Sequence, residues 1–207
     1  HAASLASSLL LRGRSLCNFA IDSHGGPPDP DAAQDGVEWL REDEALDAAE
    51  EALKRALRLR EQRGKEGLAE AVMAIGYLNY CRAGYLTRIG RAGPDGAALV
   101  PFYEAALSFY DRSLDLYWLR GPQAHADSVR MMCNIALVHS TMSRQGPAER
   151  RRASLEAAVD WYRQALALQE KSFGPKHQRT ARIRRDMVDA IDRLAALPAP
   201  ASNGGGG

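Results

Sequence analysis

The side chains whose type and spacing point most clearly to chemistry are the basic ones near the C-terminal end of this sequence. Residues 171–185 contain six bases and no acid: Lys171, Lys176, Arg179, Arg182, Arg184 and Arg185. Residues 29–51, in contrast, carry ten acids and a single base, Arg41. Ammonium and guanidinium groups attract carboxylates and phosphates, so a basic region of this kind can dock an acidic partner. The simpler alternative is a solvated basic face that binds nothing.

No pattern for covalent or metal chemistry accompanies this basic region. The sequence lacks the G-x-S-x-G, phosphate-loop and H-E-x-x-H motifs, and its five histidines have no metal-ligand spacing. The acids of segment 22–36 do not follow the calcium-loop pattern, so we expect a solvated loop there. Three widely spaced cysteines (Cys17, Cys81 and Cys133) indicate buried thiols rather than a disulfide framework. We therefore expect no catalytic residue, no cofactor and no metal ion.

The composition favours a helical globular protein without a strong charge bias. Of the 207 residues, 45% are hydrophobic and 26% are charged, and the net charge is +1. Alanine, leucine, arginine and glutamate are abundant, and all four favour helix. No apolar stretch is long enough to cross a bilayer, so we expect no membrane insertion. A net charge near zero gives no overall reason to expect nucleic-acid binding.

A spaced motif occurs three times and predicts the core of three helices. Its copies are Ala49-x3-Leu53-x2-Ala56-Leu57, Ala106-x3-Tyr110-x2-Ser113-Leu114 and Ala158-x3-Tyr162-x2-Ala165-Leu166, at spacings of 57 and 52 residues. Positions i, i+4, i+7 and i+8 share one face of an α-helix. Small residues at i and i+7 allow a neighbouring helix to approach closely, while the large residues fill the space between them. Repeats of this period indicate stacked helical hairpins.

A turn follows each copy of the motif. Gly174-Pro175-Lys176-His177 follows the third copy, Gly121-Pro122 and His125 follow the second, and Gly64 has the same offset after the first. Glycine favours a left-handed helix cap, and proline blocks continuation of the helix. The phrase YRQALALQEKSFGPKHQRTA resembles tetratricopeptide repeats (TPR) of the kinesin light chain type. The resemblance is strongest over residues 158–181, and it weakens over 106–138 and 45–80.

The repeat and its turns predict an all-α fold, a TPR-like α-solenoid of about 3.5 antiparallel hairpins with long loops inside the repeats. The expected units are 1–64, 65–121, 122–174 and 175–196, followed by a flexible tail at 197–207. Helices are expected at 3–20, 37–62, 68–87, 99–119, 125–143, 154–172 and 178–196, and loops at 22–36, 88–98 and 144–152.

The first twenty residues allow two interpretations. They are rich in Ser, Ala, Leu and Arg and contain no acid, which is typical of an organellar transit peptide. His1 can also be set in register with His125 and His177, each of which precedes a helix. We favour this second interpretation, in which the segment is the first helix of a repeat in a longer array.

The resemblance implies a function in protein recognition. In such repeats an Asn of the first helix faces a concave groove and binds a peptide backbone, and Asn134 matches that position. Asp186 and Ala74 hold the corresponding positions of other units, so the groove pattern is kept in part. We expect a non-enzymatic interaction or scaffold module of a larger assembly in the cytoplasm, with a cytoskeletal, ciliary or organellar complex as further options. The alternatives are an RNA-binding helical-repeat protein and a purely structural subunit, and the absence of a recognised RNA module disfavours the first.

Overall fold

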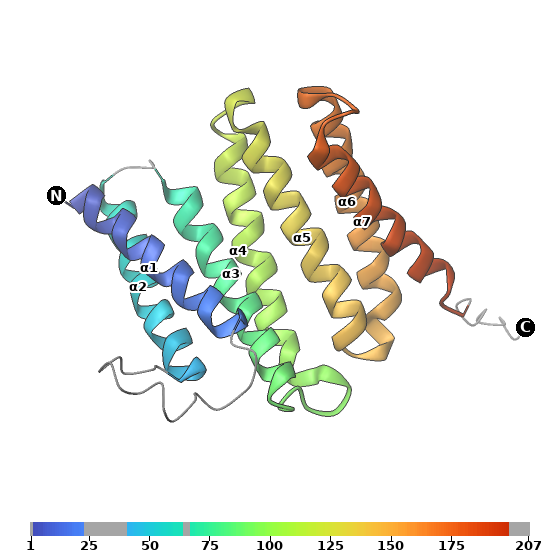
Figure 1. Cartoon of the computed structure of the whole chain (residues 1–207), viewed down its shortest axis with the longest axis horizontal. Coiled ribbons are helices and arrows are strands. Elements are labelled where there is room, and N and C mark those ends of the chain that lie inside the picture. The colour runs from blue at the N-terminus through green and yellow to red at the C-terminus, as the bar shows by residue number, and fades with distance from the viewer. Residues whose placement is uncertain (1, 23–40, 64–66, 199–207) are drawn as a thin grey trace, which may run out of the picture.

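The computed structural model describes residues 2–22, 41–63 and 67–198, and these residues form helices and connections without a β-strand. The described ranges hold seven α-helices (Figure 1): α1 Ala2–Asp22, α2 Glu42–Arg63, α3 Leu68–Arg88, α4 Val100–Trp118, α5 His125–Gln145, α6 Arg151–Phe173 and α7 Gln178–Ala195. Short 3₁₀ segments, Pro94–Leu99, Pro122–Ala124 and Ala148–Arg150, precede α4, α5 and α6. The expected all-α class is therefore confirmed. Gly64, nearly all of the expected loop at 22–36 and most of the expected tail lie outside the described residues.

The helices pack in adjacent pairs. Helix α1 lies against α2, α3 against α4, and α5 against α6, while α7 packs on α6. Successive helices run in opposite directions, and the pairs stand side by side from the N-terminal to the C-terminal end of the molecule (Figure 1). Contacts of α2 with α3 and of α4 with α5 join neighbouring pairs. This arrangement is compatible with an α-solenoid, in which each hairpin covers an apolar face of the next.

The repeated motif forms the inner face of α2, α4 and α6, as its spacing predicts. The small residues of all three copies are fully buried: Ala49, Ala56, Ala106, Ser113, Ala158 and Ala165. Leu53, Tyr110 and Tyr162 fill the space between them and are also buried. Ser113 replaces alanine in the second copy, and its hydroxyl donates a hydrogen bond to the carbonyl of Ala69, 2.9 Å away. This bond satisfies a polar group that would otherwise be buried without a partner.

Two glycines allow the first helix of a pair to cross its second helix closely. A Cβ atom at Gly76 of α3 would lie 2.9 Å from the ring of Tyr110 and 3.2 Å from the carbonyl oxygen of Ala106. The close crossing of α3 and α4 therefore depends on the absence of a side chain at Gly76. Gly13 of α1 meets Leu53 of α2 in the same way, at 2.6 Å, and the sequence reasoning did not single it out.

The Gly-Pro turns differ from the left-handed caps that the sequence indicates. Gly121 and Gly174 have φ values of 78° and 85°, but their ψ values are −159° and 163°. This extended region with positive φ is open essentially to glycine alone. The proline after each glycine explains the difference, because its ring disfavours helical ψ at the preceding residue.

Of the expected loops, the one at 144–152 is shorter than the sequence suggests, and the one at 88–98 is closely packed. Helix α5 extends to Gln145 and α6 begins at Arg151, so the expected loop at 144–152 shrinks from both sides. In the 88–98 loop, Gly96 has a φ of 70° and lies so close to Gln145 that a Cβ would collide with its backbone carbonyl. Leu99, next to this loop, is fully buried. Across the described ranges, no helix is both long enough and apolar enough to cross a membrane.

Candidate protein-binding groove

An open groove with a volume of about 650 Å³ lies between α5 and α7, and Tyr162 of α6 contributes to its wall. Three residues of α7, Arg179, Arg182 and Asp186, line one side, and Asn134 of α5 lines the other. The α7 residues are spaced i, i+3 and i+7, which places them on one face of the helix. Helix α5 is the first helix of its pair with α6, and α7 packs on the other helix of that pair, α6.

The structure brings together five of the nine residues that the sequence proposes for partner binding. Asn134, Asp186, Arg179, Arg182 and Arg185 all line the groove. These residues come from two helices far apart in the chain, so their proximity depends on how α5 and α7 lie relative to each other. The groove expected from the first helices and the basic region expected from residues 171–185 therefore overlap in space.

The other four residues lie elsewhere. Ala74 is 1% exposed in the core between α1, α2 and α3, so it has no surface to offer a partner, and this part of the expectation is corrected. Its methyl group faces apolar neighbours because the position falls on the inner stripe of α3. Lys171 and Lys176 are exposed outside the groove lining. Arg184 points to another side of α7, where its guanidinium binds the carboxylate of Glu170 at 2.6 Å.

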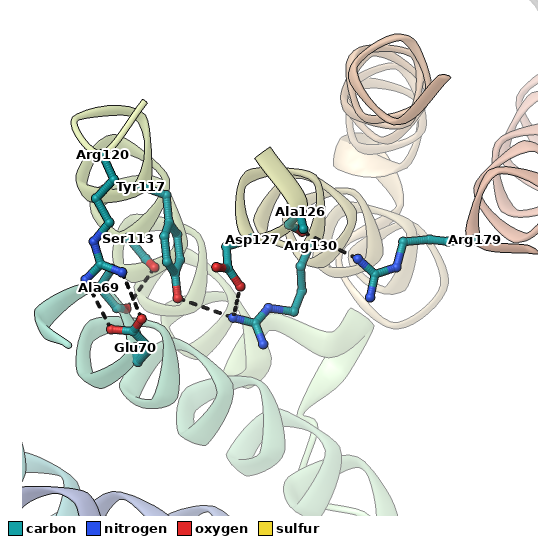
Figure 2. Close-up of polar contacts among 9 residues, drawn as sticks. All are labelled: Ala69, Glu70, Ser113, Tyr117, Arg120, Ala126, Asp127, Arg130 and Arg179. Carbon is teal, nitrogen blue, oxygen red and sulfur yellow. Dashed lines mark hydrogen bonds and ion pairs between the residues drawn. The ribbon is translucent and has the colours of Figure 1, made fainter. Parts of the chain in front are cut away.

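Arg130 is a groove residue that the sequence reasoning missed. It lies on α5, 52 residues before Arg182, so the register of the repeat could have identified it. Its Nη2 atom donates to the Tyr117 hydroxyl at 3.2 Å and to the Asp127 carboxylate at 2.8 Å (Figure 2). Its Nε is buried without a hydrogen-bond partner in the described structure. These bonds hold the guanidinium in place at the groove edge.

Charge in the groove is only partly compensated. Asp127 neutralises Arg130, and Asp186 lies 3.9 Å from Arg182 within α7. Arg179 donates a hydrogen bond to the carbonyl of Ala126 at 3.5 Å, which links α7 to the start of α5 (Figure 2). No carboxylate in the described ranges forms an ion pair with Arg179 or Arg185. The groove therefore presents two guanidinium groups that can accept an acidic ligand.

The turn before α7 fixes the position of Arg179. The ring Nδ1 of His177 accepts a hydrogen bond from the backbone N–H of Arg179 at 3.1 Å, which caps the first turn of α7. The hydroxyl of Thr180 donates to the carbonyl of Gly174 at 2.9 Å, and Thr180 is fully buried. His177 thus has a structural role, because it satisfies an N–H group that the helix leaves free, whereas the matching His125 contacts the Ser172 hydroxyl at 3.1 Å.

The groove has no activated nucleophile. Cys133 lines it, but burial raises the pKa of this thiol to about 12, with Arg179 opposing the shift. At neutral pH the thiol is therefore protonated, and a protonated thiol is a poor nucleophile. Across the described part of the chain, no group of three or more His, Cys, Asp or Glu side chains is arranged to hold a metal ion. The groove lining can therefore bind a ligand through charge pairing and hydrogen bonds.

A smaller cavity of about 190 Å³ lies between α3 and α5 and is less suited to a charged ligand. Its polar groups bind one another: the Tyr103 hydroxyl donates to Gln145 at 2.6 Å, and Thr87 donates to the same oxygen at 3.3 Å. Its basic residue, Arg88, binds the carboxylate of Glu42 and the carbonyl of Ala20. The α5–α7 groove is therefore the better candidate site.

Geometry alone supports this assignment. No protein-family model, no curated protein and no solved structure matches the chain.

Proposed function

We propose that this chain is a TPR-like α-solenoid that acts as a non-enzymatic interaction module within a larger assembly. It binds an acidic segment of a partner protein in the groove between α5 and α7. The observation that carries the proposal is the pair of groove arginines, Arg179 and Arg185, that have no carboxylate partner in the described ranges.

The groups around these arginines fit a peptide with acidic side chains. A guanidinium binds a carboxylate through two parallel hydrogen bonds, which adds geometric specificity to the charge attraction. The amide of Asn134 both donates and accepts, as a peptide backbone requires. Asp186 lies in the same lining, 3.9 Å from Arg182, and disfavours a ligand that places a carboxylate next to it, so the groove is selective for the spacing of acidic residues.

The lining favours a protein ligand over RNA. Recognition of single-stranded RNA relies on exposed aromatic rings that stack on the bases. Among the residues that line the groove, Tyr162 carries a phenol ring, and it is only 4% exposed. The other ring in the lining is His177, which is exposed, but it lies against Phe173 with the ring centroids 5.6 Å apart and its Nδ1 caps α7. The groove therefore offers a base a single small ring that already has a structural role.

Fluorescence anisotropy with a labelled peptide of alternating Glu and Leu tests the proposal. Arg179→Glu and Arg185→Glu are each expected to weaken binding by roughly tenfold to hundredfold, because a charge-assisted hydrogen bond contributes about 1.5–3 kcal/mol. Arg151→Glu is the matched control, since Arg151 is an exposed arginine outside the groove lining. It should change the affinity less than about twofold.

Three results would contradict the proposal. The first is no binding of the acidic peptide at low ionic strength. The second is an equal loss of peptide affinity in the Arg151 control, which would mean that the peptide is attracted by the positive charge of the whole surface and not by the groove. The third is tighter binding of a labelled oligouridine with a steep salt dependence, which would favour the RNA alternative.

A further inference from the structure

One face of α7 is exposed, and no helix within residues 2–22, 41–63 and 67–198 packs on it. Five residues, Ala181, Arg184, Val188, Asp192 and Ala195, follow one another at intervals of three or four and therefore share this face. All five are exposed, and Val188 is 46% exposed. We call this set the α7 outer face. The groove residues Arg179 and Arg182 precede Ala181 and Arg184 by two positions, which places them on the far side of the helix.

The register of the repeat identifies the residues of α5 that correspond to the α7 outer face. The residues 52 positions earlier lie on α5, and all five are buried: Val129, Met132, Ala136, Ser140 and Ser143. Val188 corresponds to Ala136, and Ala136 corresponds to Gly76, which lies against Tyr110 of the second helix in its own pair. The centre of the α7 outer face thus corresponds to the face that α3 turns toward α4 at Gly76. At the other end of the corresponding α5 face, Ser140 and Ser143 bind Arg193 of α7.

The charges on the α7 outer face are unsuited to a second helix like those already present. Arg184 stands where α5 has Met132, and Asp192 stands where α5 has Ser140. An apolar inner face such as that of α6 would bury Asp192 without a partner and leave Arg184 with Glu170 alone, and a buried unpaired charge is strongly unfavourable. The occupant of this face must instead present an acid opposite Arg184 and a base opposite Asp192.

A second copy of α7 meets this requirement. When two α7 helices lie antiparallel with Val188 on the twofold axis, residues that are equally far before and after position 188 face each other. Arg184 then faces the partner copy's Asp192, and Ala181 faces its Ala195. Twofold symmetry repeats each pair, so the interface holds two ion pairs, two small–small contacts and a central valine pair.

We propose that the α7 outer face docks antiparallel on the same face of a second copy of this chain. Arg184 can bind Glu170 of its own chain and the partner copy's Asp192 at the same time. A guanidinium has five N–H donors, and Glu170 accepts from one of its nitrogens. The small residues Ala181 and Ala195 allow the helix axes to approach closely at both ends of the contact. The groove residues Arg179, Arg182 and Asp186 lie on the opposite side of α7, whereas Arg185 flanks the interface. Docking therefore leaves the part of the groove around Arg179 and Arg182 accessible to a ligand.

Light scattering after size exclusion, over a range of protein concentrations, tests the proposal. The average mass of the chain is expected to rise from 22.6 kDa toward twice that value as concentration increases. Asp192→Arg places like charges opposite each other at both symmetric pairs and should raise the dissociation constant at least tenfold. Adding Arg184→Asp to that variant reverses both pairs and should restore most of the affinity.

Asp189→Arg is the matched control, because it makes the same change of charge on the same helix but outside the α7 outer face. Asp189 is exposed and pairs only with Arg193, 3.5 Å away in the described structure. This variant should dimerise like the unmodified chain. A Val188→Cys variant oxidised with copper phenanthroline should give a disulfide-linked band of twice the mass, whereas Asp189→Cys should not.

Several outcomes would overturn this inference. They are a constant mass of one chain at all concentrations, equal effects of the Asp192 and Asp189 changes, and failure of the charge reversal to restore affinity. Circular dichroism establishes that each variant is folded. The inference is independent of peptide binding: Asp192→Arg should bind the acidic Glu-Leu peptide with unchanged affinity, so either idea can fail alone.

Discussion

Gly76 provides a direct test of the close crossing between α3 and α4. Replacing a glycine by alanine inside a helix normally stabilises it, because glycine is about 1 kcal/mol less favourable than alanine there. At Gly76 the added methyl group would lie 2.9 Å from the ring of Tyr110 and 3.2 Å from the carbonyl oxygen of Ala106. Tyr110 is 2% exposed, so its ring has no free space into which it can move.

The sign of the change in unfolding free energy depends on two opposing effects, the gain in helix propensity and the cost of overpacking the core. Overpacking a well-filled core costs about 1–3 kcal/mol. After subtraction of the gain in helix propensity, Gly76→Ala should lower the free energy of unfolding by roughly 1 kcal/mol. Gly84 of the same helix is the matched control, since a Cβ there meets no atom within 4 Å. Gly84→Ala should raise the free energy of unfolding by about 0.5–1 kcal/mol.

Urea unfolding followed by circular dichroism at 222 nm measures both variants. The two substitutions are chemically identical and lie two turns apart on α3, so only their surroundings differ. Their melting temperatures should move in opposite directions, each by roughly 2–4 °C for a chain of this size. If Gly76→Ala stabilises the protein as much as Gly84→Ala does, the helices do not cross as closely as described and the reasoning is refuted.

Two further predictions concern groups with shifted pKa values. Burial lowers the pKa of His139 below its ordinary 6.5, so the folded state favours the neutral ring. Its contribution to stability is present above pH 6.5 and is lost as pH falls, and His139→Gln should flatten the decline in melting temperature between about pH 7 and pH 5. An unchanged decline would argue against this cause. The raised pKa of Cys133, about 12, predicts that maleimide labels this thiol roughly a hundredfold more slowly than an unfolded one at pH 7.5, as mass spectrometry of the labelled peptides can show. Equal rates in folded and urea-unfolded protein would contradict it.

Several features of the fold are predictable from the sequence because they depend on local spacing. The boundaries of α3, α4 and α7 fall within one residue of the expected ones. Periodic apolar residues, proline near the start of α4 and glycine after α6 are local signals that act over a few residues. The burial of Ala106, Tyr110 and Ser113 also follows from position on one helical face.

The groove was predictable only in part. Asn134 and Asp186 occupy equivalent positions of two units, and the basic region lies near one of them in the sequence. Arg130 was not predicted as a groove residue, because an isolated arginine in an apolar helix has no local signature. Its partners, Tyr117 and Asp127, were likewise unremarkable until the packing of α4 on α5 placed the Tyr117 hydroxyl beside it.

The sequence by itself determined the helices, the faces they bury and the pairing of neighbours, because these depend on the 3.6-residue period and on short turns. The tertiary structure decided which basic residues act together. Arg182 and Arg184 are two positions apart, yet one lines the groove and the other binds Glu170. Ala74 shares its repeat position with two groove residues but is buried. Accessibility depends on which helices stack on each face, and that stacking joins residues far apart in the chain.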